Sequence, residues 1–102
     1  MSSPITLNND EGSPTNIISI DSTTVKSAII EYSILRGTTA EVGRIFITTD
    51  GTTLSFEEDK ANNVDTGVSL IGSLSGSLIL IDYVSTNTGQ TATFRYSLRV
   101  LN

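Results

Sequence analysis

The chain has 102 residues, with six Lys or Arg, eleven Asp or Glu, and a formal net charge of −5. This length fits one domain with a single hydrophobic core. Binding to a phosphate backbone or to an anionic membrane needs clustered basic residues, which this composition lacks. We therefore expect neither a nucleic acid nor a membrane as a partner.

Cysteine, histidine and tryptophan are all absent. Their absence excludes disulfides, thiolate nucleophiles, a Ser-His-Asp triad and imidazole metal ligands. Two adjacent carboxylates, Glu57 and Glu58, point to opposite faces if they lie on a strand, and so cannot form the facing pair of a glycosidase. We expect a protein that is not an enzyme and that carries no cofactor.

The first sixteen residues, MSSPITLNNDEGSPTN, contain two prolines and no sustained period. Only Ile5 and Leu7 alternate, as in one short strand. We interpret residues 1–16 as an extended N-terminal arm that is either disordered or docked on a neighbour, and residues 17–102 as the folded domain.

Beyond residue 16 the apolar residues repeat with a period of two, and turn signals follow every 8 to 12 residues. Gly43 is interpreted as a bulge just before the strand RIFITT, and Gly72 as a break in the strand VSLIGSL. The pattern predicts an all-β fold, an antiparallel β-sandwich of about seven strands, either jelly-roll or Ig-like. The segments that carry it are IISI, KSAIIEYSILRG, RIFITT, LSFEED, VSLIGSL, SLILIDYVS and ATFRYSLRVL.

Three local features add detail to this prediction. Asp50-Gly51 predicts a two-residue type I′ hairpin turn, because Gly tolerates and Asp accepts the positive φ that both central positions need. Residues 87–90, Asn-Thr-Gly-Gln, predict a second hairpin loop. The continuous apolar run in SLILIDYVS predicts a central strand that is covered on both faces.

The acidic stretch from Glu57 to Asp65 offers oxygen ligands of the kind that calcium accepts. It lacks the spacing of a helix–loop–helix calcium loop, so a solvated connection with charged residues on a sheet edge is the favoured interpretation. We predict no metal site from the sequence.

Four arginines alternate with apolar residues on three predicted strands: Arg36, Arg44, Arg95 and Arg99. If those strands are neighbours, the arginines form one stripe. The favoured partners are Glu31 and Glu41 within the domain, through cross-strand pairs. Acidic groups of another subunit are the alternative.

Several segments, in order along the chain, resemble short virion-associated proteins and modules of tailed bacteriophages. They are SPITLNND, DSTTVKSAIIEYSILRGTT, EVGRIFITTDGTTLSF, DTGVSL and TGQTATFRYSLRV. Proteins of this kind are all-β and serve as capsid decoration (cement) proteins or as parts of tail fibres and spikes. The resemblance implies a structural virion protein.

We expect a decoration protein on the capsid surface that binds the major capsid protein and stabilises the assembled head. The chain starts with Met and ends within the final strand, as a complete small protein would. The alternative is a tail fibre or spike component that recognises a host-surface glycan. Decoration proteins of this size often sit at threefold positions, so a trimer is the first expectation for a homo-oligomer.

A strand added to a neighbour's sheet edge supplies main-chain hydrogen bonds, which makes the arm the first candidate contact. The arginines are candidate electrostatic contacts, and the Asp50-Gly51 turn could present polar groups at a loop tip. The candidate partner-binding residues are Pro4, Ile5, Leu7, Arg36, Arg44, Asp50 and Thr52.

Overall fold

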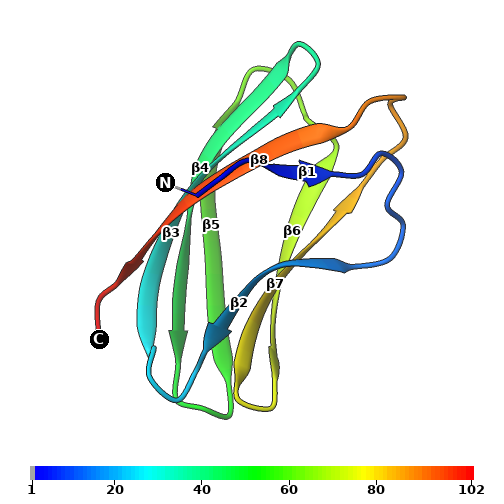
Figure 1. The fold of residues 1–102 in the computed structure, drawn as a ribbon. Coiled ribbons are helices and arrows are strands. Elements are labelled where there is room, and N and C mark those ends of the chain that lie inside the picture. The colour runs from blue at the N-terminus through cyan, green and yellow to red at the C-terminus, as the bar shows by residue number, and fades with distance from the viewer. Residues whose placement is uncertain (1) are drawn as a thin grey trace.

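A computed structural model describes residues 2–102, which form eight strands in two antiparallel sheets (Figure 1). The all-β sandwich predicted from the sequence is confirmed, with one strand more than expected. The strands are β1 (Ile5–Leu7), β2 (Thr15–Asp21), β3 (Ser27–Arg36), β4 (Thr39–Thr49), β5 (Leu54–Asn62), β6 (Val68–Ser75), β7 (Leu78–Ser85) and β8 (Ala92–Val100).

The five-stranded sheet has the order β1-β8-β3-β4-β5, and the three-stranded sheet has the order β2-β7-β6. Strands β3, β4 and β5 form a meander, and the other sheet packs against one face of it (Figure 1). The first two strands lie in different sheets, unlike strands A and B of an immunoglobulin domain. The pairing of β1 with β8 and of β2 with β7, one pair in each sheet, is closer to a jelly roll.

Strict alternation of buried and exposed residues along β3 and β4 places one face of the larger sheet in the core. Period-two patterning therefore predicts the faces of these strands correctly. Fully buried side chains from both sheets meet between them, and the largest belong to Tyr32, Phe94, Leu7, Ile30, Ile34, Ile45, Ile79 and Ile81.

Gly43 and Gly72 do not interrupt their strands, which corrects the predicted bulge and break. The register of β4 runs without a shift through Gly43, and that of β6 through Gly72. A Cβ at Gly43 would lie 2.7 Å from Tyr32 Oη, and a Cβ at Gly72 would overlap the ring of Phe56. Each glycine thus makes room for an aromatic side chain.

Two predicted turns differ from the structure. Thr49 pairs with Leu54, so the β4–β5 loop has four residues, and Gly51 takes a positive φ of 97° while Asp50 does not. Residues 87–90 lie in a crossover between sheets, because β7 and β8 belong to different ones. Strand β7 is central as predicted, but only its inner face is fully buried.

The N-terminal segment is part of the sandwich. Ile5 pairs with Phe94 and Leu7 with Ala92, so β1 forms one edge of the larger sheet. Leu7 is completely buried. The short strand expected at these residues is present, docked on the chain's own β8, and no boundary between an arm and a domain falls at residue 16, since β2 begins at Thr15.

Candidate functional site

The seven candidate partner-binding residues are spread over the molecule and do not form one site. Pro4 is exposed and Ile5 half-buried at the β1 edge. Asp50 and Thr52 lie in the β4–β5 loop, at the opposite end of the sandwich from Arg36. Arg44 lies on the outer face of the larger sheet, and Leu7 lies in the core.

Arg36 is 3% exposed, so its place in the interior corrects the expectation of a surface contact. Its guanidinium donates hydrogen bonds to three backbone carbonyls, those of Thr66 at 2.9 Å, Thr86 at 2.6 Å and Gln90 at 3.0 Å. It also donates to Asn9 Oδ1 at 2.8 Å. Arg36 therefore joins the β1–β2, β5–β6 and β7–β8 loops at one end of the sandwich.

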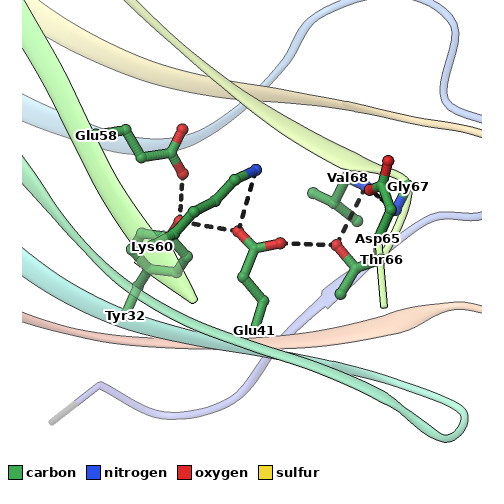
Figure 2. Close-up of polar contacts among 8 residues, drawn as sticks. All are labelled: Tyr32, Glu41, Glu58, Lys60, Asp65, Thr66, Gly67 and Val68. Carbon is green, nitrogen blue, oxygen red and sulfur yellow. Dashed lines mark hydrogen bonds and ion pairs between the residues drawn. The ribbon is translucent and has the colours of Figure 1, made fainter. Parts of the chain in front are cut away.

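A buried polar cluster joins β3, β4, β5 and the β5–β6 loop (Figure 2). Glu41 accepts hydrogen bonds from Tyr32 Oη at 2.9 Å and from Thr66 Oγ1 at 2.9 Å. Its Oε2 also lies 3.9 Å from Lys60 Nζ. Tyr32 Oη contacts Glu58 as well. The two carboxylates thus flank one hydroxyl, and Thr66 links them to the β5–β6 loop.

Burial raises the pKa of Tyr32 well above its usual range, and its hydrogen bonds to Glu58 and Glu41 raise it further. The hydroxyl therefore stays protonated and acts as a donor at neutral pH. Because Glu41 is buried and already accepts from Tyr32 and Thr66, its two oxygens are engaged within the chain. This arrangement supports packing of the sheet rather than chemistry on a substrate.

The acidic stretch divides between the two faces of β5. Glu57 and Asp59 point outward, while Glu58 points inward to Tyr32, as predicted for adjacent carboxylates. Asp65 accepts from the Gly67 amide at 2.9 Å. In residues 2–102 no three Asp, Glu, His or Cys side chains come together in a way that could hold a metal ion.

The outer face of the five-stranded sheet faces away from the other sheet, and no other element covers it (Figure 1). It carries large apolar side chains in exposed positions, with exposed fractions of 57% for Leu35, 61% for Val42 and 38% for Phe46. The Arg44 guanidinium lies 5.8 Å from the centre of the Phe46 ring. Exposed apolar groups among charges are typical of a protein-binding surface.

The predicted arginine stripe is present on this face only in part. Arg44 lies on β4, whereas Arg95 and Arg99 lie on β8, separated from it by β3. The ion pairs expected with Glu31 and Glu41 do not form: between residues 2 and 102, the one ion pair within 4.0 Å joins Lys60 and Glu41. Although Arg44 stands opposite Glu31 in the register, their charged groups stay apart.

Sequence reasoning missed the buried cluster and the exposed Phe46. The sequence did contain a signal that Glu41 is buried. Glu41 lies four residues before Ile45 and six before Ile47 on one strand, so it points to the same inward face. In the described residues, 2–102, no helix is long and apolar enough to cross a membrane.

No protein-family model and no curated protein matches the chain. Among solved structures, it is similar to the tailspike protein of Acinetobacter phage vB_ApiP_P1, with a TM-score of 0.54 and 15% sequence identity. The match covers 99% of this chain and 23% of the tailspike chain. This chain and the matched segment of the tailspike share a fold. The likeness thus concerns one segment of the tailspike, of the size of a single domain.

Proposed function

We propose that this chain is a non-enzymatic structural protein of a bacteriophage particle, which acts by binding neighbouring protein surfaces. The observation that carries the proposal is the likeness of nearly the whole chain to a segment of a phage tailspike. The resemblance of its strand and turn segments to virion-associated proteins supports the same class. The uncovered sheet face supplies a surface suited to protein contacts.

Two places in the particle remain as hypotheses. Decoration of the head is favoured by the sequence resemblance, and binding of each copy only to the assembled shell would stabilise that shell by mass action. A place in the tail fibre or spike is favoured by the tailspike likeness. Of the two, we propose the tail first, because that likeness spans the entire sandwich.

Glycan recognition within such a tail component has less support. Sugar sites commonly use an exposed aromatic ring beside polar groups. Tyr83, the aromatic residue hardest to place from the sequence, is 2% exposed, and its hydroxyl accepts from the Asn8 amide. Phe46 is exposed, but it lies in an apolar and charged surface rather than in a polar groove.

The test is the copy number of this chain in purified particles of the phage whose genome encodes it, measured by quantitative mass spectrometry against the major capsid protein. A small number in multiples of three or six supports the tail. Hundreds of copies support decoration of the head. Absence from the particles overturns the proposal as a whole.

A further inference from the structure

The two edges of the uncovered sheet face carry opposite charges. On the β5 side the outward positions include Glu57 and Asp59. On the β8 side, three strands away, they include Arg95 and Arg99. All four side chains are exposed, and none forms an ion pair within 4.0 Å in the described part of the chain. The face is therefore acidic along one edge and basic along the other.

The register places these charges and the apolar groups in cross-strand rows. One row runs from Arg99 on β8 through Ile29 on β3 and Phe46 on β4 to Glu57 on β5. The next row runs through Ser97, Glu31, Arg44 and Asp59. Within each row the outer members differ in charge or polarity, and the inner members form a matched pair, Ile29 with Phe46 and Glu31 with Arg44.

A face of this kind is complementary to itself under one particular symmetry. If a second copy packs face to face, with a two-fold axis between β3 and β4 and parallel to them, each row meets the same row in reverse order. Glu57 of one copy then faces Arg99 of the other, Arg44 faces Glu31, and Phe46 faces Ile29. Sheets commonly pack in this way, with strands nearly aligned and about 10 Å between the layers.

Other symmetries do not match the charges. A two-fold axis across the strands would bring β5 against β5, and so acidic residues against acidic ones. A three-fold axis cannot place this face against itself, since only a two-fold axis makes one patch its own partner. Repulsion between like charges disfavours the dimer with its axis across the strands, and attraction between opposite charges favours the dimer with its axis parallel to them.

We propose that the outer face of the five-stranded sheet is a self-association surface, through which two copies of this chain form a dimer with a two-fold axis parallel to the strands. The apolar side chains of the two inner strands, Ile29 and Phe46 on one side of the Glu31–Arg44 row and Val42 and Leu35 on the other, supply the buried area, and the charged residues set the orientation. The proposal stands on the geometry of the face and does not depend on the phage function proposed above.

Charge reversal tests the pairing. The 102-residue chain is examined by sedimentation equilibrium over a range of concentrations, and we expect a monomer–dimer equilibrium. Glu57→Arg or Arg99→Glu alone turns two attractive contacts per dimer into repulsive ones, and should raise the dissociation constant about tenfold. The double variant, Glu57→Arg with Arg99→Glu, should restore most of the affinity.

Ser73→Arg is the matched control, because Ser73 is exposed on the three-stranded sheet, away from the proposed interface. It should leave the dissociation constant unchanged. Circular dichroism of every variant confirms that the fold is retained. A chain that stays monomeric at millimolar concentration, a trimer, or a double variant as weak as the single ones would overturn the proposal.

The direction of the axis has its own readout. The chain has no cysteine, so a spin label can be attached at a single introduced site, Thr52→Cys. An axis parallel to the strands puts both β4–β5 loops at the same end of the dimer, and the label separation should be well below the 39 Å length of one chain. A separation near or above that length would mean an axis across the strands and would overturn the proposed arrangement.

Discussion

Tyr32 lies against Gly43 on the neighbouring strand, so closely that a Cβ on Gly43 would approach Tyr32 Oη to 2.7 Å and the Asp59 carbonyl to 2.9 Å. The two residues are direct cross-strand partners. The glycine lets the Tyr32 side chain lie across the sheet and reach Glu41 and Glu58. Formation of the buried cluster therefore depends on a missing side chain on β4.

Gly43→Ala should lower the free energy of unfolding by about 1–3 kcal/mol, because the added methyl group overlaps the ring and the backbone cannot yield. Gly12→Ala is the control, since no atom lies within 4 Å of the position of its Cβ. Urea unfolding of both variants measures the difference. Equal stabilities would mean that the ring does not occupy this space.

Removal of the Tyr32 hydroxyl should change the response of stability to alkaline pH. The unfolded chain loses the tyrosine proton near pH 10, whereas the raised pKa keeps it bound in the folded chain. The contribution of Tyr32 is thus complete below about pH 10 and is lost as the pH rises further. In Tyr32→Phe, the unfolding free energy should decline less steeply between about pH 10 and 11.5, because unfolding no longer releases the Tyr32 proton. If the unfolding free energy of Tyr32→Phe falls with pH as steeply as that of the unchanged chain, the pKa of Tyr32 is not raised in the fold.

The same variant should be less stable at neutral pH by about 1–3 kcal/mol, because the buried Glu41 and the half-buried Glu58 lose the hydroxyl donor that they share. Tyr96→Phe serves as the control. Tyr96 is also partly buried beside Phe94, and among the described residues its hydroxyl has no hydrogen-bond partner. If both variants lose the same amount of unfolding free energy, the loss comes from general packing and not from the hydrogen bonds of the cluster.

Arg36→Met should lower the free energy of unfolding by about 3 kcal/mol or more, since three backbone carbonyls in two loops and the Asn9 side chain in a third lose their donor. Arg44→Met, on the exposed outer face, should change it by about 0.5 kcal/mol or less. Thermal and urea unfolding of the two variants make the comparison. If the two substitutions lower the free energy of unfolding by the same amount, the hydrogen bonds of Arg36 to the loops do not stabilise the fold.

The faces of the strands were predictable from the sequence because period-two alternation reports burial directly. Ile30, Tyr32 and Ile34 face the core as expected, and Glu31 and Ser33 face outward. Glycines were misread because a strand glycine can mark either a bulge or a close approach, and only the neighbouring strand decides between them. Gly72 is such a close approach, because it lies beneath Phe56, which comes from the other sheet.

The candidate contacts were the least predictable part. Arg36 and Leu7 are surface residues by the sequence prediction, yet the fold buries both. Leu7 pairs with β8, and Arg36 binds three loops. Such long-range contacts do not show in the local sequence pattern. A buried arginine satisfied by backbone carbonyls leaves no charge partner to search for in the sequence. Arg44 was correctly expected at the surface, because it alternates with Ile45.

The β4–β5 loop should respond to acid through Asp50. Its carboxylate accepts from the backbone amides of Thr53 at 2.8 Å and Thr52 at 2.9 Å and from both hydroxyls, and these bonds hold its pKa below the usual range. The stabilisation is therefore present above about pH 4 and is lost as the pH falls further. Asp50→Asn keeps an acceptor, so it should remove this acid dependence with a smaller loss of stability at pH 7 than Asp50→Ala. A carbon-detected NMR titration of Asp50 with a midpoint near 4 would contradict the bonding.

Leu7 tests whether the first residues belong to the core. It is completely buried, and β1 is further tied to β8 by hydrogen bonds between Ser2 and Tyr96 at 2.7 and 2.9 Å. Leu7→Ala should therefore lower the free energy of unfolding by about 2–5 kcal/mol, while Thr6→Ala, exposed on the same strand, should have little effect. Removal of residues 1–16 should destabilise the chain further, because it uncovers the β8 edge. If residues 17–102 alone unfold at the same urea concentration as the whole chain, the segment is an independent arm after all, and the contacts of β1 contribute nothing to the core.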